Sequence, residues 1–499
     1  LDAVDCRRGN QPQLTCNFEN PSKGAVDVND TVLSDPIETN LAVIGGGLSG
    51  LTAGVTAAER GLSVHVFERG ADERYPCNSR FAGGAFHVAY TDPTSDPSGL
   101  VDAINRVTKD EADPNLATVV AENAARTIYW LRDHGVDFSP GPTPMHKFLV
   151  TPHRPMLAGL DWPGHGPDEM IKSLTRKLLA AGGTLHRDAE ALELLMDGEA
   201  CKGMSVRIGE DDPIQVSAKS VLIADGGFQG NPNMVGKYIA KRPDLLVQRS
   251  AGTATGDGIR MAEAAGAELI FMERFYGHFL AREAMQREGF SPYPQLDQIA
   301  AAAIVVDNTG RRFVDEGLGG IYMSNVVSRF DNPAATFTIF DRDIWEKGPG
   351  VKSVYPANPT IERSGGTVYR AESPADLARQ LEVNPGTLTE TIESYNNCLQ
   401  DGSRVAQGIP RSDHAVPAAP LDTSALLAIP LVVGITNTMG GIAIDATMRV
   451  KRPDGSTIDG LYAIGGSTGG LEGGGTIGYV GGLIKAALTG LIAGESVAA

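Results

Sequence analysis

Three glycines at the end of the first apolar segment have the spacing of a phosphate-binding turn. They are Gly45, Gly47 and Gly50, in the pattern Gly-x-Gly-x-x-Gly. The first glycine permits a tight turn, the second lets a pyrophosphate approach the backbone, and the third lets a helix pack closely on a strand. A helix that begins at this turn offers free N–H groups and the positive end of its dipole to phosphate oxygens. The spacing therefore predicts a dinucleotide site.

The elements around the turn are those that a dinucleotide site requires. Leu41 to Ile44 is a short apolar run that predicts a strand, and the Ala-rich stretch from Leu51 to Arg60 predicts a helix. Ser63 to Phe67 predicts a second strand, which completes a βαβ unit of about 30 residues. Glu68 follows that strand, 23 residues after Gly45, where a carboxylate binds ribose hydroxyls. A tight turn without a ligand is the alternative.

The composition limits the classes of function. The chain has 499 residues, with 43 Lys and Arg against 61 Asp and Glu, and a net charge of −18. This balance argues against nucleic-acid binding, which relies on clustered positive charge. No run approaches the roughly 18 apolar residues that a membrane span needs. The nine His residues have no metal-binding spacing. We therefore expect no nucleic acid partner, no membrane span and no metal.

Residues 1–36 are rich in Asn, Asp, Pro and Ser and lack hydrophobic periodicity, which predicts a polar N-terminal extension. The five cysteines are too few and too scattered for a disulfide framework. Cys6 and Cys16 could pair if the protein were exported. Because the chain begins at Leu1 rather than Met, a precursor segment could have been removed. We expect a cytoplasmic protein, with export as the alternative.

The strand-then-glycine pattern returns twice later in the chain, at Ser220–Phe228 and Gly460–Gly466. Between these stretches the composition changes: aromatic residues and prolines are more frequent, and two helices are predicted, Pro374–Leu381 and Thr387–Cys398. A change of this kind indicates an insertion. The sequence therefore predicts an α/β fold in which a Rossmann-like nucleotide-binding domain, residues 37–266 and 426–499, is interrupted by an α+β domain, residues 267–425.

These glycine-rich stretches, together with Gly252–Ile259, resemble those of one flavoprotein superfamily. From about residue 38 to residue 499 the chain resembles soluble fumarate reductases, succinate dehydrogenase flavoprotein subunits and 3-ketosteroid dehydrogenases. The resemblance implies an FAD-binding domain of the glutathione-reductase type. It also implies that the inserted domain is a cap that closes over the substrate.

The resemblance carries FAD contacts onto particular residues. Asn78–Gly84 resembles the segment beside the flavin, where the succinate dehydrogenase branch has a His that tethers FAD covalently. No His stands there in this chain, so non-covalent FAD is expected. Gly466 departs from the pattern, because many relatives have a Glu there that binds the ribitol. The implied FAD contacts are Gly45, Gly47, Leu48, Ser49, Gly50, Glu68, Arg69, Asn78, Ser79, Gly83, Gly84, Ala224, Gly226, Asp257, Gly465, Gly466, Thr476 and Ile477.

Most of the residues that handle a dicarboxylate in fumarate reductases are replaced. Gly310–Glu316 resembles those enzymes, but the Arg that follows it there and delivers a proton is missing. The His before Met-Gly-Gly is replaced by Asn437 or Thr438, and the C-terminal His and Arg correspond to Glu472 and about Thr476. Without bidentate Arg partners, a doubly anionic substrate would be held poorly.

Ketosteroid dehydrogenases use tyrosines instead, and Tyr322 and Tyr479 resemble those positions. A Tyr hydroxyl would polarise a carbonyl oxygen while another group removes the α-proton and the flavin N5 accepts hydride from the β-carbon. His278 resembles a position where a His contacts a substrate oxygen, and Arg282 could hold a single carboxylate or form a surface salt bridge. Glu472 could act as a base only if burial raised its pKa.

We therefore predict an FAD-dependent oxidoreductase of a CH–CH bond next to a carbonyl, which desaturates a cyclic or steroid-like ketone. One alternative is a fumarate-reductase-like reductase of an unsaturated acid, which would need Arg154, Arg282 or Arg312 in the site. The other is a non-catalytic electron-relay flavoprotein, against which the capping insertion argues. The expected partners are a small carbonyl substrate and an electron acceptor of unknown identity.

Overall fold

The carboxyl ends of four parallel strands meet at one edge of an eight-stranded sheet in the computed structural model, which describes residues 36–154, 162–353 and 355–499. The register aligns Ile44 with Phe67 and with Ile223, and Ile223 with Ala463. The residues that follow these strand ends therefore gather at this edge, where ligands of open α/β sheets bind. The strands in spatial order are β20 (Arg449–Lys451), β21 (Thr457–Ala463), β9 (Ile214–Ile223), β1 (Ile37–Ile44), β2 (Val64–Phe67) and β6 (Thr184–His186).

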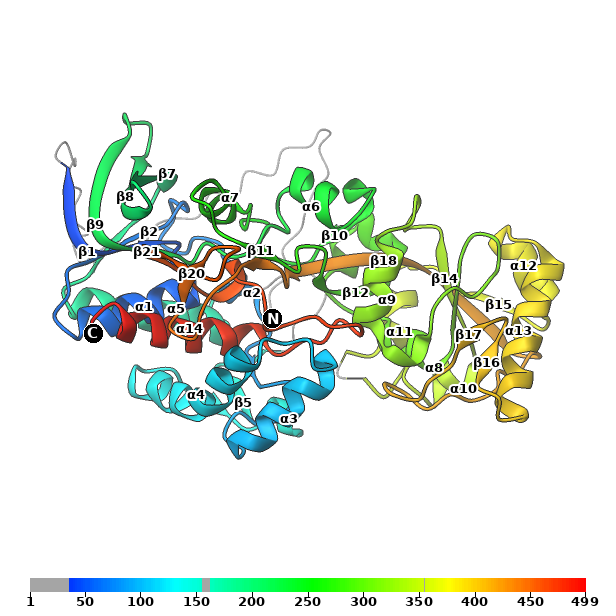
Figure 1. Cartoon of the computed structure of the whole chain (residues 1–499). Helices are drawn as coiled ribbons and strands as arrows, with labels where there is room; N and C mark the ends of the chain where they lie inside the picture. Colours follow the sequence, from blue (N-terminus) through cyan, green and yellow to red (C-terminus); the bar gives the residue numbers. More distant parts are fainter. Residues whose placement is uncertain (1–35, 155–161, 354) are drawn as a thin grey trace, which may run out of the picture. The chain divides into compact units, whose positions relative to one another are not determined.

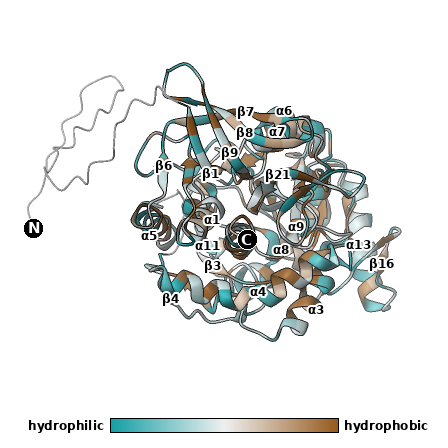
Figure 2. Ribbon diagram, turned by 60° about the vertical axis from the view of Figure 1, so that its left-hand side comes forward, coloured by the Kyte–Doolittle hydropathy of each residue, from teal (hydrophilic) through white to brown (hydrophobic). Residues whose placement is uncertain are grey.

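Helices α1 (Leu48–Ala58), α5 (Gly166–Ala180) and α14 (Gly482–Ser496) lie along one face of this sheet (Figure 1). The C-terminal helix α14 approaches α1 closely, because a Cβ at Gly490 would lie 2.5 Å from the carbonyl oxygen of Ser49. The antiparallel strands β7 (Ala189–Asp197) and β8 (Ala200–Ile208) extend the sheet from β9. Hydrophobic and hydrophilic colours alternate along these strands in Figure 2, as expected for strands with one solvated face.

A second sheet is organised around the long strand β18 (Leu426–Thr438). This strand pairs along its length with four others: β10 (Val247–Gln248), β12 (Phe275–Ala281), β14 (Thr336–Asp341) and β15 (Tyr369–Ala371). A further strand, β13 (Ile304–Val306), pairs with β14. β18 thus pairs with strands of the predicted insertion, residues 267–425, although its own residues were predicted to belong to the nucleotide-binding domain. Residues 36–499 form one compact unit, so the predicted domain boundaries stay predictions.

The helices of the inserted part flank the second sheet. The predicted helix Pro374–Leu381 is α12 with the same bounds, and the predicted helix Thr387–Cys398 lies within α13 (Pro385–Gln400). α13 begins earlier because Pro385 takes its first position and the Asn384 side chain accepts a hydrogen bond from the N–H of Thr387 (3.0 Å). The remaining helices that bear on the site are α3 (Pro97–Thr108), α4 (Pro114–Asp133), α7 (Asp257–Ala264), α8 (Asp297–Ala302) and α9 (Gly320–Val327).

Residues 36–499 form one compact unit with helices and sheets in the order that an α/β fold requires, and the predicted fold class is confirmed. The predicted extension lies outside the described residues except for Pro36, and so do Cys6 and Cys16. The cysteines Cys77, Cys201 and Cys398 are buried free thiols. No helix in the described ranges has the length and apolar character that crossing a membrane requires.

Candidate functional site

The glycine turn after β1 is shaped by close backbone contacts. Gly45 has a φ of +103°, and a Cβ there would lie 2.7 Å from the carbonyl oxygen of Ala224. A Cβ at Gly50 would lie 2.0 Å from the carbonyl oxygen of Gly45. Only glycine meets both requirements, the left-handed backbone at 45 and the tight helix-to-turn packing at 50. Helix α1 therefore begins directly at the carboxyl edge of the first sheet.

Glu68 is fixed at this edge, directly after β2. Its Oε2 accepts a hydrogen bond from the N–H of Gly46 and its Oε1 accepts one from the N–H of Gly70, both at 2.8 Å. Burial raises the pKa of this carboxyl. The Tyr75 hydroxyl donates to the Gly46 carbonyl (2.7 Å), which ties the turn to the same segment. The carboxylate thus stands beside the phosphate-binding turn, where a ribose hydroxyl of a dinucleotide would be its partner.

A cavity of about 1220 Å³ runs along this edge and on toward the second sheet. This volume exceeds the roughly 300–1,000 Å³ of a typical small-molecule site, so it accommodates a dinucleotide and a second molecule. All the predicted FAD contacts line it except three. Leu48, Gly50 and Gly465 lie behind the lining, where the N–H of Leu48 donates to Ser79 Oγ (3.1 Å) and the two glycines allow close packing.

The lining fits FAD on two further observations. A Cβ at Gly83 would meet nothing within 4 Å, so this glycine borders open space in the cavity. Arg69 donates to Thr255 Oγ1 and to Asp257 Oδ2, both at 3.1 Å, and so joins the segment after β2 to the first turn of α7. Because these residues surround the helix N-terminus at Gly47, the cradle has the shape and the free N–H groups that a pyrophosphate needs.

Rings crowd the other end of the cavity. We call His87, Tyr90, Tyr276, His278 and Tyr479 the ring cluster, and all five line the cavity. Tyr276 stacks on Tyr479 with ring centroids 3.9 Å apart and meets His278 edge-on at 4.7 Å. Burial raises the pKa of both stacked tyrosines, and it lowers the pKa of His87 to about 4. The hydroxyls are therefore protonated and His87 is neutral at pH 7.

His278 is held by an acid at the buried end of the ring cluster. Its Nδ1 lies 2.5 Å from Asp297 Oδ2, and the other Asp297 oxygen accepts the N–H of Phe279 at 3.0 Å. Its Nε2 is buried and has no hydrogen-bond partner among the described residues. Burial lowers the pKa of this imidazole, although Asp297 opposes the effect. A neutral His that donates through Nδ1 carries a lone pair on Nε2, so it can accept a proton from a molecule in the cavity.

Glu472 lines the cavity, but its carboxylate oxygens bind groups of the protein itself. Its Oε1 accepts the N–H groups of Val480 (3.1 Å) and Gly481 (3.3 Å), and its Oε2 lies 3.3 Å from Lys485 Nζ. The side chains of Glu472 and Lys485 are only 1% and 4% exposed. Glu472 therefore fixes the turn that carries Tyr479, and its ion pair with Lys485 leaves it poorly suited to be the base that the sequence suggested.

Tyr322 and Arg282, the other two predicted catalytic residues, do not line the cavity. Tyr322 lies on α9, whose neighbouring residues Gly320 and Ile321 reach the lining instead. The Arg282 guanidinium donates to the carbonyl of Thr336 (3.3 Å) and stacks over the Phe337 ring at 4.9 Å. The chain turns after β12 and directs this side chain to the second sheet.

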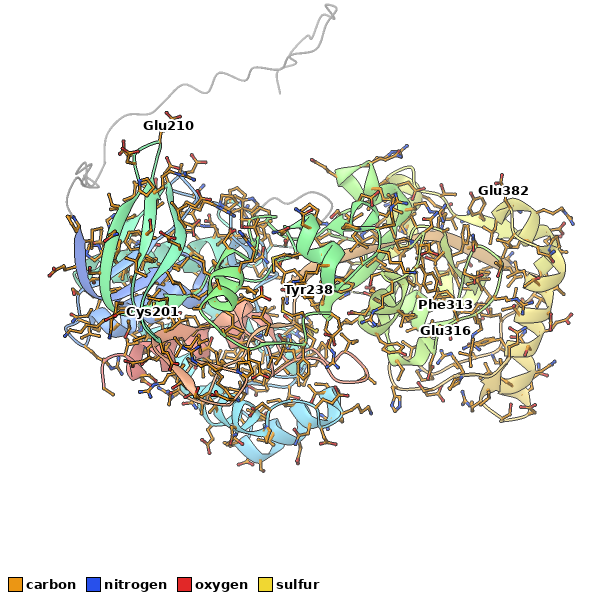
Figure 3. The ribbon with its side chains drawn as sticks, turned by 45° about the horizontal axis from the view of Figure 1, so that its top comes forward. Cys201, Glu210, Tyr238, Phe313, Glu316 and Glu382 are labelled. Atoms are coloured by element: carbon orange, nitrogen blue, oxygen red, sulfur yellow. The ribbon has the colours of Figure 1, made fainter. Side chains whose placement is uncertain are left out.

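The other arginines that would have favoured an acid substrate are also elsewhere. Arg312 forms a buried ion pair with Glu316 at 2.6 Å. Figure 3 labels Glu316 near Phe313. Arg154 is exposed and donates to the carbonyls of Pro163 and Gly164. Neither arginine lines the cavity.

Arg249 is a cation of the lining that the sequence reading missed. It follows β10 and is 6% exposed. One NH2 group donates to Thr436 Oγ1 (2.5 Å) and the other to the carbonyl of Pro292 (3.1 Å), while Nε has no partner among the described residues. Burial lowers the pKa of this guanidinium. The sequence did contain one indication that Arg249 lies near the ligand. It stands four residues before the Thr253–Gly258 turn, which must approach the ligand.

Asp297, Tyr276 and Lys485 were missed as well. Tyr276 stands two residues before His278 on one strand, and this spacing could have indicated a shared face. Asp297 and Lys485 carry no such local signal. No group of three or more His, Cys, Asp or Glu in the described part of the chain could hold a metal ion.

Comparisons with known proteins agree with this geometry. The model of the FAD binding domain family matches residues 40–478. NADH:fumarate oxidoreductase of Klebsiella pneumoniae (strain 342) is 27% identical over 460 residues, 89% of this chain and 46% of that protein. NADH:acrylate oxidoreductase of Vibrio harveyi is 26% identical over 573 residues, 99% of this chain and 53% of that protein. The chain thus spans about half the length of these relatives.

The fold also has solved counterparts. The structure of 3-ketosteroid-Δ4-(5α)-dehydrogenase from Rhodococcus jostii RHA1 superposes with a TM-score of 0.71 at 21% identity, over 94% of this chain and 99% of that one. The predicted resemblance to the fumarate reductase and ketosteroid dehydrogenase superfamily is confirmed. With a cradle that fits the dinucleotide and a family model that covers most of its length, this chain belongs to the FAD binding domain family, and FAD is its cofactor.

Proposed function

We propose that this chain is an FAD-dependent oxidoreductase that acts on a carbon–carbon bond next to a carbonyl group and desaturates a cyclic ketone. The observation that carries the proposal is His278, which has a buried, unpartnered Nε2 and lines the same cavity as Tyr479 and the dinucleotide cradle. A base and a hydroxyl donor in one cavity are what enolisation of a ketone requires.

Tyr479 is the residue that holds the carbonyl oxygen in this proposal. Its hydroxyl oxygen accepts the N–H of Gly482 (2.7 Å), and a hydroxyl that accepts one bond keeps its proton for another partner. Because burial keeps this tyrosine protonated, it can donate to an oxygen on which negative charge develops. The stacked Tyr276 ring holds it in place.

His278 is the base in this proposal. Asp297 accepts the Nδ1 proton and so fixes the tautomer that presents the Nε2 lone pair. Nε2 takes the proton from the carbon α to the carbonyl while the hydride leaves the β-carbon, and the two breaking C–H bonds leave a C=C bond. FAD, when bound, supplies the two-electron acceptor for that hydride. An electron acceptor of unknown identity then returns the cofactor to its oxidised form.

A second candidate is reduction of an unsaturated carboxylic acid, and Arg249 favours it. Arg154, Arg282 and Arg312 give this candidate no support, but a buried guanidinium with a free Nε is a suitable carboxylate partner. Support for the two candidates from relatives is divided. The NADH:fumarate and NADH:acrylate oxidoreductases are named for acids, and the Rhodococcus enzyme is named for a ketosteroid.

An anaerobic titration of the flavin-loaded protein tests the proposal. Cyclohexanones and 3-ketosteroids should bleach the flavin absorbance, and succinate should not. Bleaching by succinate alone would support the acid candidate instead. If the flavin bands stay unchanged with every compound while dithionite reduces them, the electron-relay alternative replaces both.

The role of His278 is tested with His278→Gln, compared with His186→Gln as a control. His186 lies on β6, outside the cavity lining, and hydrogen-bonds His65 (2.8 Å). Removal of a general base slows the chemical step by about 10²–10⁴-fold. The His278 variant should show this loss in the rate of bleaching at an unchanged flavin content, whereas the His186 variant should keep the wild-type rate.

A further inference from the structure

We propose that Arg249 binds one carboxylate of the substrate, so that the substrate is a cyclic oxo acid rather than a neutral ketone. This inference rests on the proposed function, because it places the carboxylate relative to the carbonyl that Tyr479 and His278 handle. Its evidence is independent of theirs and comes from the surroundings of Arg249.

The chain makes room for Arg249 at a defined place. Its N–H donates to the carbonyl of Ile435 (2.9 Å), which anchors it to β18. A Cβ at Gly434 would lie 2.3 Å from the Arg249 Cδ, so the aliphatic part of the side chain crosses β18 over a residue without a side chain. Any larger residue at 434 would displace the guanidinium. The arginine is therefore held in place by its stem, and not only by its hydrogen bonds.

Arg249 has no ion-pair partner among the described residues, although the charge of the Asp297 carboxylate acts on it from a longer distance and raises its pKa against the effect of burial. The buried acids of the lining have other partners: Asp297 binds His278, Glu472 binds Lys485, and Asp225 accepts from Gly258 and Ser467. No described carboxylate forms an ion pair with Arg249, whose guanidinium donates to the neutral oxygens of Thr436 and Pro292. A buried cation is costly unless it is paired, so an incoming carboxylate would complete the site.

The sheet register places this cation next to the proposed base. Gly434 is paired with His278 on β12 and with Val247 on β10, and Arg249 directly follows the end of β10. His278 and Arg249 thus approach the cavity from the two sides of β18. Tyr293, 5.9 Å from the Arg249 guanidinium carbon, adds an aromatic wall. One ring that carries a ketone and a carboxylate at separate positions would reach both groups.

Binding of simple probes to the flavin-loaded protein tests the role of Arg249 separately from turnover. The probes are benzoate and benzamide, which have nearly the same shape and differ in charge, and the readout is the shift of the flavin absorbance. The wild type should bind benzoate at least tenfold more tightly than benzamide, since a hydrogen bond to a charged group has about that effect. Arg249→Met should bring the two affinities within about twofold, and Arg249→Lys should keep part of the preference. Flavin content and melting temperature verify that each variant is folded.

A second pair of probes, 4-oxocyclohexanecarboxylate and its primary amide, connects binding with bleaching. The oxo acid should bleach the flavin of the wild type at a lower concentration than the amide, and Arg249→Met should remove the difference. Equal affinity of the wild type for benzoate and benzamide would overturn the inference, and so would loss of the preference in Arg282→Met but not in Arg249→Met. Failure of every ketone to bleach would instead remove the proposed function, even if benzoate still bound through Arg249.

Discussion

Lys485→Met should destabilise the protein more than the double change that also replaces its partner Glu472 by Gln. The two side chains form a buried ion pair at 3.3 Å, and the single substitution leaves the Glu472 carboxylate buried without its cation. In the double variant the Gln amide oxygen can still accept the N–H groups of Val480 and Gly481. The comparison therefore isolates the cost of an unpaired buried charge.

The magnitude follows from the burial. Removing one partner of a buried pair costs about 3–5 kcal/mol, whereas replacing both partners by neutral residues is often close to neutral. Unfolding entropy is about 2.1 cal/mol/K per residue, so for a unit of the size of residues 36–499 about 1 kcal/mol corresponds to about 1 °C. We expect Lys485→Met to lower the melting temperature by about 3–5 °C and the double variant to lie within about 2 °C of the wild type.

Thermal unfolding of the flavin-loaded protein, followed by the rise in flavin fluorescence, measures these shifts. Lys347→Met is the matched control, because Lys347 forms an ion pair with Asp343 on the surface, where both side chains are 71% exposed. It should not shift the melting temperature measurably. A double variant that melts as low as Lys485→Met would refute the reasoning, since it would mean that the methionine itself, and not the unpaired charge, causes the loss.

Three further outcomes are expected. Gly50→Ala should abolish flavin binding in the purified protein, because its Cβ would lie 2.0 Å from the Gly45 carbonyl oxygen; flavin absorbance per protein measures this, and full occupancy would contradict it. Burial raises the pKa of Asp225 to about 6, from 3.8, so its stability contribution is full below about pH 4 and is lost, by about 3 kcal/mol, as the pH rises through 6. Asp225→Asn should remove that part of the fall in melting temperature between pH 4 and pH 6.5, and parallel curves for the two proteins would disprove the assignment. Acid precipitation should leave all the flavin in the supernatant, as expected for non-covalent FAD, and a fluorescent pellet would show a covalent bond.

The dinucleotide half of the site was predictable because its signals are local. The turn at Gly45 to Gly50, the two strands around it and Glu68 lie within one short segment, and each residue type follows from backbone geometry at that place. Helix α12 was predicted with the correct bounds for the same reason, since its apolar period and the Pro at its start are local.

The substrate half was predictable only in part. Tyr479 and His278 line the cavity as the resemblance implied, but Tyr322 and Arg282 do not. The chain leaves strand β12 at Ala281 and turns at Arg282, and this change of direction could not be located from the residues around it. Arg249 was overlooked because its position depends on a strand almost 200 residues later in the chain. Gly434 on that strand leaves space for the arginine side chain, and nothing in the sequence near Arg249 indicates this.

The sequence by itself determined the fold class and the FAD cradle. These features depend on short-range backbone geometry, which requires particular residue types at particular spacings. Only the tertiary structure decided that Glu472 pairs with Lys485, that Asp297 orients His278, and that Arg249 reaches the cavity without a carboxylate. Each of these features depends on the distance between polar or charged groups on separate segments of the chain. The packing of those segments sets that distance, and the spacing of residues along the chain does not reveal it.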